Sequence, residues 1–343
     1  MNQTPYISTV DAEPLHRYQQ GGYHPITLGE SLKAGREDTY VAIKIPVAET
    51  EYDGDTRERQ TLKELASHHP HPKHTVHMLD DFDLKGPNGS HKCLVYELLG
   101  PNVPDIIDAK FPDGRLPGKL AKIIAKQSLI GLDGLHQRKI GHGDLHTRNL
   151  AFTMPYTDDL AEDRFIGMLG KPEIGYVQRR DGKCLEAGVP EYIVRPASYR
   201  NHSWNLAQNA KIIDFGESFS LTAVPETLHT PLSVRAPEVI FQDHIDYRVD
   251  LWSMGCMLFE LFAGQPPFDT FLITSPILVG QMREMATDEL PERWQDKWNT
   301  MKMGDVMATE STGHNLQEWL EEVYFDGPLS PDLTREDIIV TTP

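Results

Sequence analysis

The sequence predicts an α+β fold in two parts, a small β-rich part followed by a larger helical part. Runs of β-branched and aromatic residues gather before residue 100, and helical periodicity dominates from Leu120 onward. The chain has 343 residues. At about 150 residues per domain, this length suffices for two domains or for one large two-lobed domain with a sizeable core.

The first part contains three predicted strands. The run TYVAIKIPV, residues 39–47, indicates a buried strand that contains Lys44. Two further strands, near 75–84 and 91–98, flank KGPNGS, whose composition is typical of a hairpin turn. Residues 1–20 are polar, and we expect them to form a flexible N-terminus.

A helix is predicted after the first strand. Asp55 with Glu58 three residues later forms a capping box, and Glu58 shares a helical face with Leu62 and Leu65. The carboxylate of Glu58 has two possible partners, the backbone N–H of Asp55 or the ammonium of Lys44, and cannot fully serve both. We expect the ion pair.

The second part alternates helices with short strands. Helical spacing covers 120–139, and residues 249–264 are apolar on nearly every face, as in a central helix. Short apolar runs at 150–154 and 210–213 indicate strands. The stretch between them, 154–209, is rich in Pro, Gly and charge, and is expected to be an insert with local structure of its own.

The composition is typical of an acidic globular protein. It has 33 Lys plus Arg against 51 Asp plus Glu, a net charge of −18, which disfavours nucleic acid and favours basic partners. Cys93, Cys184 and Cys256 lie far apart, which excludes a disulfide framework and a zinc knuckle and fits a reducing compartment. With no signal-like N-terminus, and Glu260 within the longest near-apolar run, we expect no membrane span and a cytoplasmic or nuclear location.

Two motifs bring together the groups that phosphoryl transfer requires. The loop HGDLHTRNL places Asp144 and Asn149 five residues apart, and KIIDFGES places Asp214 where an apolar strand meets a glycine turn. Phosphoryl transfer needs a carboxylate to accept the hydroxyl proton, an amide and a carboxylate for Mg²⁺, and a lysine for the nucleotide phosphates. Asp144, Asn149, Asp214 and Lys44 would supply them.

Each of these residues also has a purely structural interpretation. Lys44 could extend its ammonium to the surface, and Asp144 and Asp214 could be turn-forming residues. The joint occurrence of the motifs favours the catalytic interpretation.

Other residues are more simply structural. The five histidines between residues 68 and 77 are interrupted by prolines and have no cysteine nearby, so a solvated loop is favoured over a metal site. Met254, Cys256 and Met257 are expected to pack in the core.

Taken in order, the motifs resemble those of eukaryotic protein kinases, most closely the fungal branch of the SR-protein-specific serine/threonine kinases. The matching runs are GGYHPITLGE, VAIK, HPKHTVHMLDDF, CLVYELLGPNV, HGDLHTRNLAF, KIIDFGESF, TPLSVRAPEVIF and DLWSMGCMLFEL, spread over residues 21–325. The resemblance implies a two-lobed protein kinase fold. Its small β-rich lobe would comprise 21–100 and its helical lobe 101–343, interrupted by the insert 154–209.

The resemblance also implies roles in the helical lobe. Asp144 would be the catalytic base, and Asn149 together with Asp214 would hold Mg²⁺. His146 stands where serine/threonine kinases usually have a lysine that neutralises the transferring phosphate. Because histidine is only partly charged near neutral pH, we expect stabilisation of the transition state to be weaker there or to depend on pH.

In the small lobe, the resemblance implies an ATP site. Lys44 would pair with Glu58 and with the α- and β-phosphates. Tyr96 would be the gatekeeper, and Glu97 and Leu99 would offer backbone groups to the adenine.

Three departures from the family pattern are visible. Gly143 replaces the arginine that normally senses a phosphate on the activation loop, which argues against that control. No glycine-rich loop precedes Lys44, so the first two strands are expected to be missing and a sheet edge exposed. The last helices of the family pattern are also expected to be missing, which would leave Glu238 without its arginine partner at a cost of roughly 3–5 kcal/mol.

These features leave three functional hypotheses. The first is an ATP- and Mg²⁺-dependent serine/threonine kinase acting on basic Arg-Ser-rich proteins such as splicing factors, and so on the regulation of mRNA processing. The second is a catalytically impaired pseudokinase that acts as a binding module. The third, a small-molecule kinase, is suggested by the HGDLHxxN pattern but disfavoured by the Ala-Pro-Glu and DLWSMG runs. The acidic side chains of Glu318, Glu321, Glu322 and Asp326 are either a substrate-docking surface or a solvated helix face.

Overall fold

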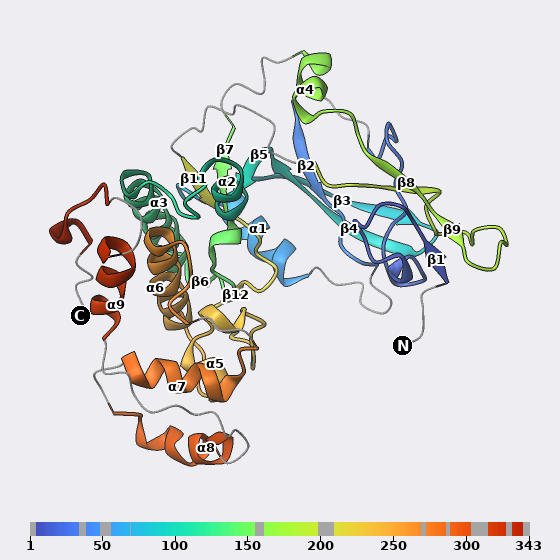
Figure 1. The fold of residues 1–343 in the computed structure, drawn as a ribbon. Coiled ribbons are helices and arrows are strands. Elements are labelled where there is room, and N and C mark those ends of the chain that lie inside the picture. Colours follow the sequence, from blue (N-terminus) through green and yellow to red (C-terminus); the bar gives the residue numbers. More distant parts are fainter. Residues whose placement is uncertain are drawn as a thin grey trace. The chain divides into compact units, whose positions relative to one another are not determined.

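The computed structural model of the protein describes residues 5–33, 39–48, 56–68, 70–154, 161–197, 209–268, 272–285, 289–302, 315–326 and 331–338. The chain divides into two compact units (Figure 1). The first comprises Met1–His69, Val76–Leu99 and Met154–Asn205, and the second comprises Pro70–Thr75, Gly100–Thr153 and Leu206–Pro343. The greater part of the insert therefore belongs to the same unit as the N-terminal residues.

The predicted three-stranded sheet and its helix form the centre of the first unit. The strand order is β2 (Val41–Lys44), β4 (Gly89–Glu97) and β3 (Met78–Gly86), and both pairs are antiparallel. Helix α1 (Arg57–Ser67) contacts β3. Strand β2 lies at one edge of this sheet, and the described residues 8–33 contain no strand.

The start of α1 differs from the predicted capping box. Thr56 is the N-cap, and its side-chain oxygen accepts the backbone N–H of Arg59 at 3.2 Å. Asp55, the predicted N-cap, lies outside the described residues. A threonine hydroxyl satisfies the N–H of the third helical residue as a carboxylate would, which leaves the Glu58 carboxylate available for another partner.

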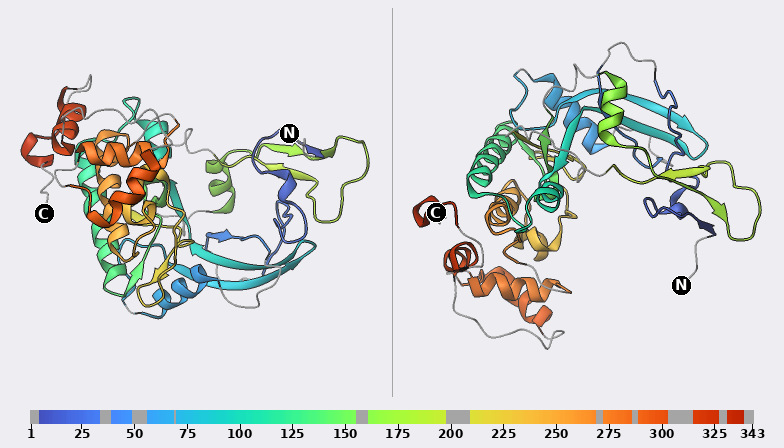
Figure 2. Two further views of the ribbon diagram at one scale, coloured as in Figure 1. Left: turned by 90° about the horizontal axis from the view of Figure 1, so that it is seen from below. Right: turned by 45° about the horizontal axis from the view of Figure 1, so that its top comes forward.

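The N-terminal residues and the insert build a small core together. β1 (Tyr6–Ile7) pairs with β9 (Gln178–Arg179), as the two colours side by side in Figure 2 show. The insert also contributes α4 (Glu162–Leu169) and the antiparallel pair of β8 (Ile174–Tyr176) with β10 (Tyr192–Val194). The buried apolar side chains come from both segments and are Tyr6, Val10, Leu15, Tyr18, Val177, Val189 and Ile193. The structure thus packs residues 5–20, which were expected to be flexible, against the insert.

Asn88, at the tip of the β3–β4 hairpin, joins these segments. Its side-chain Nδ2 donates to the backbone carbonyl of Tyr23 at 2.6 Å and to that of Gly188 at 2.7 Å. Its backbone carbonyl accepts the backbone N–H of Gly21 at 2.8 Å. Asn88 is 2% exposed. One amide therefore connects the hairpin, the N-terminal segment and the insert.

Replacing Asn88 with alanine should lower the free energy of unfolding by about 2–4 kcal/mol, because two buried carbonyl groups lose their donor. Equilibrium unfolding in urea measures this change. Lys85→Ala, an exposed substitution in the same hairpin, is the control and should alter stability by less than about 0.5 kcal/mol. Equal effects of the two substitutions would show that Asn88 does not join the segments energetically.

A second junction places two imidazoles together under the hairpin. The rings of His24 and His91 lie 5.0 Å apart between centroids and are nearly perpendicular. His91 Nδ1 bonds to the carbonyl of Pro46 at 2.8 Å, whereas His24 Nδ1 and His91 Nε2 are buried without hydrogen-bond partners among the described residues. Burial, and then the neighbouring His91, lower the pKa of His24, against a smaller opposing effect of Glu30.

Acid should therefore destabilise the protein through His24. The unfolded chain binds this proton near pH 6.5, the ordinary histidine value, whereas the folded chain resists it. The free energy of unfolding should fall as the pH drops below that value. Because burial also lowers the pKa of His142, the informative quantity is the difference between wild type and His24→Phe, measured by urea unfolding from pH 7.5 to 5. Wild type should lose more stability than the variant, and parallel pH profiles would contradict the assignment.

The second unit is mainly helical. Its core joins α3 (Gly118–His136) to the central α6 (Arg248–Ala263), which lie side by side in Figure 1. As predicted, Met254, Cys256 and Met257 of α6 are buried. The remaining helices are α2 (Val103–Lys110), α5 (Pro237–Ile240), α7 (Ser275–Met285), α8 (Glu292–Lys302) and α9 (Leu316–Glu321). The 3₁₀ turns are η1 (Leu15–Arg17) in the first unit and η2 (Thr147–Asn149), η4 (Leu232–Val234) and η6 (Arg335–Ile338) in the second, with a π-helical turn η5 (Glu322–Asp326).

Two small sheets support the loops of this unit. One has the order β11 (Ala210–Ile212), β7 (Leu150–Thr153) and β5 (Leu99–Asn102), and the other pairs β12 (Phe219–Ser220) with β6 (Ile140–Gly141). The strands predicted at 150–154 and 210–213 are thus β7 and β11, paired antiparallel. Their pairing brings together the two motifs that the insert separates along the chain.

The C-terminal described residues pack on α3. Asp332 Oδ1 accepts the backbone N–H of Gly118 at 2.9 Å and the hydroxyl of Tyr324 at 2.6 Å. Glu318 forms a capping box with Asn315, and Glu321 pairs with Arg335. Asp326 lies 3.8 Å from the same arginine, so three of the acidic residues weighed as a docking surface have partners within the chain.

Glu238 differs from its expected environment. It is half-buried rather than buried, so the cost expected for an unpaired buried carboxylate does not apply to it. Among the helices of the described residues, none is both long and apolar enough to cross a membrane.

Candidate active site

The predicted site residues fall into two groups, one in each unit. In the first unit, Lys44 Nζ lies 2.8 and 2.9 Å from the two carboxylate oxygens of Glu58. The hydroxyl of Tyr96 donates to the same carboxylate at 3.1 Å. Glu58 therefore forms the ion pair rather than a cap, and β2, α1 and β4 each contribute one member of this cluster. Lys44 does not simply extend to the surface.

The residues expected to offer backbone groups to adenine follow at the end of β4. The backbone N–H of Glu97 donates to the carbonyl of His77 at 3.1 Å, and its side chain accepts the N–H of His77 at 2.7 Å. Glu97 is thus held by both its backbone N–H and its carboxylate. Leu99 begins β5 and is half-buried.

In the second unit, a buried aspartate of α6 anchors the catalytic loop. Asp250 accepts the backbone N–H groups of His142 and Gly143, each at 2.8 Å, and also bonds to Nε2 of His136 at 3.0 Å. It is 1% exposed. A carboxylate accepting several N–H donors in the interior fixes their orientation, so α6 determines where the loop HGDLHTRNL begins.

His142 links this loop to the Asp214 motif. Its Nδ1 accepts the backbone N–H of Asp144 at 3.2 Å, so Nε2 carries the proton and donates to the carbonyl of Ile213 at 3.1 Å. Burial lowers the pKa of His142 and keeps it neutral, although Asp250 opposes that shift. The neutral ring thereby positions both aspartates that were predicted to act in catalysis.

Asp144 and Asn149 meet across the loop, as the five-residue spacing requires. Asn149 Nδ2 donates to the backbone carbonyl of Asp144 at 2.9 Å and lies 3.3 Å from its Oδ2. Asp144 Oδ1 is buried and has no hydrogen-bond partner among the described residues. Nε2 of His146 lies 3.6 Å from Asp144 Oδ2. One carboxylate oxygen is therefore held in place while the other remains able to accept a hydrogen bond.

Asp214 lies beside the pair formed by Asp144 and Asn149. The backbone N–H of Ile213 donates to the carbonyl of Asn149 at 3.0 Å, which brings the Asp214 backbone next to that residue. Asp214 has φ 63°, and its Oδ1 accepts the N–H of Gly216 at 3.3 Å. The turn-forming interpretation is thus correct for its backbone. It does not exclude a ligand role, because a carboxylate has further lone pairs.

Gly143 is required by the loop itself. Its φ is +78°, and a Cβ atom at this position would lie 2.6 Å from the carbonyl oxygen of Glu217. An arginine side chain therefore cannot occupy this position in the present loop conformation. The buried hydroxyl of Thr230 donates to the Gly143 carbonyl at 2.7 Å, and His229 bonds to Glu217 at 3.0 Å. A buried neutral hydrogen bond and a surface contact therefore help to hold the segment that follows Asp214.

The donor set in the second unit fits a hard divalent cation. The bond from Asn149 Nδ2 leaves its amide oxygen free to face a ligand, and Asp214 offers carboxylate oxygens, both of which suit Mg²⁺. Among the described residues, no three His, Cys, Asp or Glu side chains form a metal-binding cluster. This includes the histidines near residue 70, where His68, His71 and His74 bond instead to backbone carbonyls. His69 lies outside the described residues.

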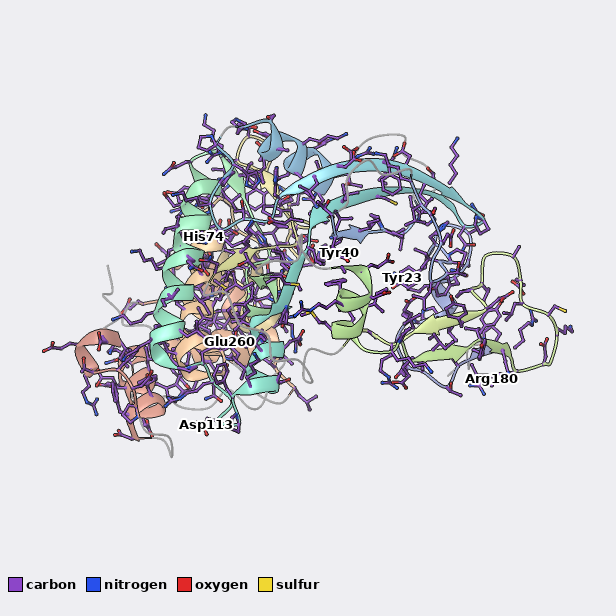
Figure 3. All side chains as sticks on the ribbon, turned by 90° about the horizontal axis from the view of Figure 1, so that it is seen from above. Tyr23, Tyr40, His74, Asp113, Arg180 and Glu260 are labelled. Atoms are coloured by element: carbon purple, nitrogen blue, oxygen red, sulfur yellow. The ribbon has the colours of Figure 1, made fainter. Side chains whose placement is uncertain are left out.

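Sequence reasoning did not assign roles to Asp250, His142 or Glu260. Glu260 of α6, labelled in Figure 3, accepts the hydroxyl of Thr147 at 2.7 Å and so fixes the turn between Asp144 and Asn149. A signal was present, since two carboxylates interrupt an otherwise apolar helix and each needs a partner when buried.

The comparisons with known proteins agree with this geometry. The protein kinase domain family matches residues 201–317. Serine/threonine-protein kinase SRPK of Physarum polycephalum is 30% identical, over 74% of this chain and 66% of that protein. Protein kinase dsk1 of Schizosaccharomyces pombe is 34% identical, over 75% of this chain and 66% of that protein. Serine/threonine-protein kinase SKY1 of Saccharomyces cerevisiae is 31% identical over 52% of this chain.

The fold and the comparisons agree on the class of protein: the protein kinase domain family matches part of the second unit, and the relatives that this chain resembles over about three quarters of its length are protein kinases. Within that family, it is similar to the SRPK-type serine/threonine kinases. The chain spans 66% of the length of the first of these relatives. All of these relatives are named as kinases, which gives no support to the alternative of a pseudokinase.

Proposed function

We propose that this chain transfers the γ-phosphate of ATP, with Mg²⁺, to serine or threonine hydroxyls of protein substrates. The observation that carries the proposal is the Asp144 carboxylate: one oxygen is held near Asn149, and the other is buried and has no hydrogen-bond partner within the described part of the chain. A buried acceptor without a donor is costly, and it is best explained by a donor that arrives with the substrate. The hydroxyl that is to be phosphorylated is such a donor.

Each site residue then has a chemical task. Asp144 accepts the proton of the attacking hydroxyl through Oδ1. Asn149 and Asp214 hold Mg²⁺, and His146 offers an N–H to the transferring phosphate. Bound ATP supplies the phosphoryl group, and Mg²⁺ neutralises its charge.

In the first unit, the Lys44 ammonium is fixed for a role in nucleotide binding. Glu58 is itself held by the Tyr96 hydroxyl, so the lysine is positioned by two contacts to one carboxylate. In this proposal Lys44 binds the α- and β-phosphates, and the carbonyl of Glu97 and the N–H of Leu99 contact the adenine. Tyr96 then acts as gatekeeper and also as the residue that orients Glu58.

We further propose that the substrate is basic and rich in Arg-Ser dipeptides. The similarity to SRPK-type kinases supports this substrate class, and a net charge of −18 favours the approach of a positively charged peptide. The steering should weaken as ionic strength rises, since the Debye length falls to about 8 Å at physiological salt.

Transfer of radiolabelled phosphate from ATP to an Arg-Ser repeat peptide tests the proposal. We expect transfer that requires Mg²⁺ and stops when EDTA is added. A peptide with Lys in place of Arg keeps the charge and tests whether guanidinium groups are recognised, and a Glu-Ser peptide tests the charge itself. Absence of transfer to any of these peptides and to intact Arg-Ser proteins, at millimolar Mg·ATP, would refute kinase activity.

Lys44→Met should reduce phosphate transfer by at least about tenfold while leaving the fold intact. The lysine is partly exposed, and Glu58 keeps its bond from Tyr96, so the loss should lie in nucleotide affinity and rate rather than in folding. Steady-state kinetics with varied ATP, alongside circular dichroism, distinguishes the two. Lys85→Met is the matched control in the same unit, and an equal loss in both variants would remove Lys44 from the nucleotide site.

A further inference from the structure

Helix α4 of the insert is anchored to the first unit by one buried side chain. Phe165 is buried, whereas the other residues of α4, all of which the structure describes, are exposed or half-buried. Glu162 and Asp163 in the first turn favour the start of the helix, and Gly170, whose φ of +79° suits glycine, ends it. The helix can therefore form from local signals, and Phe165 is its anchor.

Phe165 stacks on Tyr40, the residue directly before β2. The two ring centroids lie 4.2 Å apart, and the ring planes are inclined by 26°. Figure 3 labels Tyr40 and shows α4 beside it. Both residues belong to the first unit, although they are far apart along the chain. The insert thus contacts the strand that carries Lys44.

Tyr40 lies on the same face of β2 as Lys44. Successive side chains of an extended strand alternate between its two faces, so residues 40, 42 and 44 share one face. The exposure follows this alternation, since Val41 and Ile43 are exposed and the three residues of the other face are half-buried. The aromatic stack is therefore on the face of the strand from which the Lys44 ammonium extends.

The position of β2 depends strongly on its side chains, because it is an edge strand. In the described part of the chain it pairs with β4 alone, so backbone hydrogen bonds hold it from one side. Lys44 secures one end of the strand through Glu58. Tyr40 secures the other end through Phe165. The insert thereby supplies one of two side-chain contacts that hold the ends of this short strand.

We propose that Phe165 is a positioning residue for the nucleotide site, an inference that rests on the phosphate transfer proposed above. By packing on Tyr40, it keeps β2 where the Lys44 ammonium reaches the α- and β-phosphates. Loss of the stack lowers the fraction of molecules in which the strand is in place, and the apparent affinity for ATP falls with that fraction. At saturating ATP the ligand itself holds the strand, so the rate of transfer does not change.

Steady-state kinetics of the full chain with Phe165→Ala test this role. We expect the KM for ATP to rise about two- to tenfold, the effect of losing one aromatic pair. The kcat and the KM for the Arg-Ser peptide should keep their wild-type values, and calorimetric titration with Mg·ATP should show the same loss of affinity. Ile166→Ala, an exposed neighbour in α4, is the matched control and should behave as the wild type does.

Further variants test whether the stack itself is responsible. Phe165→Tyr retains the ring and should retain the wild-type affinity for ATP. Tyr40→Ala should reproduce the rise in KM, and Tyr40→Ala/Phe165→Ala should exceed neither single variant, because both substitutions remove the same contact. Urea unfolding of each variant verifies that folded proteins are compared.

Hydrogen exchange in the absence of nucleotide measures the strand directly. By mass spectrometry, the amides of residues 40–44 should exchange faster in Phe165→Ala than in Ile166→Ala, because the strand opens more often. This measurement does not depend on phosphate transfer, so it separates the effect of the stack on β2 from the proposed reaction.

Several results would overturn the inference while leaving the proposed function in place. These are an equal affinity for ATP, or equal exchange of residues 40–44, in Phe165→Ala and Ile166→Ala. A lower KM for ATP in Phe165→Ala would show that α4 obstructs the site, and a joint loss of kcat and peptide affinity would show a general loss of structure. A wild-type protein that binds no Mg·ATP would instead overturn the proposed function, and this role of Phe165 with it.

Discussion

Asp144→Asn should lower the rate of phosphate transfer by about 10³-fold, within the range of 10² to 10⁴ that a positioned general base contributes. The substitution keeps the shape of the side chain and the possibility of a bond with Asn149, but it removes the oxygen that accepts the substrate proton. Stability and binding of Mg·ATP should change little. Single-turnover kinetics measures the chemical step, and a thermal-shift titration with Mg·ATP measures binding.

Asn149→Asp is the informative companion to this substitution. It keeps the oxygen ligand proposed for Mg²⁺ but places a second carboxylate beside Asp144, which should raise the pKa of the pair. The activity of Asn149→Asp should therefore recover as the pH rises, whereas that of Asp144→Asn should not. Transfer that survives in Asp144→Asn at more than about a tenth of the wild-type rate would assign the proton to another group.

Asp250→Ala should cause the largest loss of stability in the second unit, about 3–5 kcal/mol. The backbone N–H groups of His142 and Gly143 would lose their acceptor in a region with no access to water. The loop that carries Asp144 would then lose its anchor on α6, so phosphate transfer should fall even at temperatures where the protein remains folded. Urea unfolding measures the loss of stability, and kinetic assays measure the fall in phosphate transfer.

Two further variants test whether this loss of stability comes from the hydrogen bonds that Asp250 accepts. Asp250→Asn retains one oxygen, so its free energy of unfolding should lie between those of wild type and Asp250→Ala. Asp133→Ala removes an exposed carboxylate from α3 and should change stability by less than about 0.5 kcal/mol. If Asp250→Ala unfolded no more easily than Asp133→Ala, the catalytic loop would be held by other contacts.

Much of the second-unit site could be predicted because its parts are close together in the sequence. Asp144 and Asn149 are separated by one turn of the loop, so their contact is fixed by local geometry. Asp214 follows an apolar strand, and the antiparallel pairing of β11 with β7 places it beside Asn149. Residue types and spacing indicated this group, and the resemblance of the motifs to those of protein kinases indicated the class of protein.

The choice between the two partners of Glu58 needed the tertiary structure. The sequence offered a capping box and an ion pair, and the ion pair was the expected outcome. In the structure, Thr56 caps the helix, and the β2–β4 pairing places Lys44 and Tyr96 within reach of the Glu58 carboxylate. Sheet register and helix packing decided a competition that local spacing could not.

The sequence by itself determined the spacing of Asp144, Asn149 and Asp214 within their motifs, because this depends on short-range order along the chain, and its resemblance to protein kinases supplied the expected fold and the expected roles of these residues. The tertiary structure alone decided what holds them. Asp250 meets the catalytic loop across 108 residues, and Asn88 meets the insert across 100. It also packed residues 5–20 with the insert into one core. Burial of a polar group makes its partner obligatory, but which distant residue becomes that partner depends on the packing of whole elements.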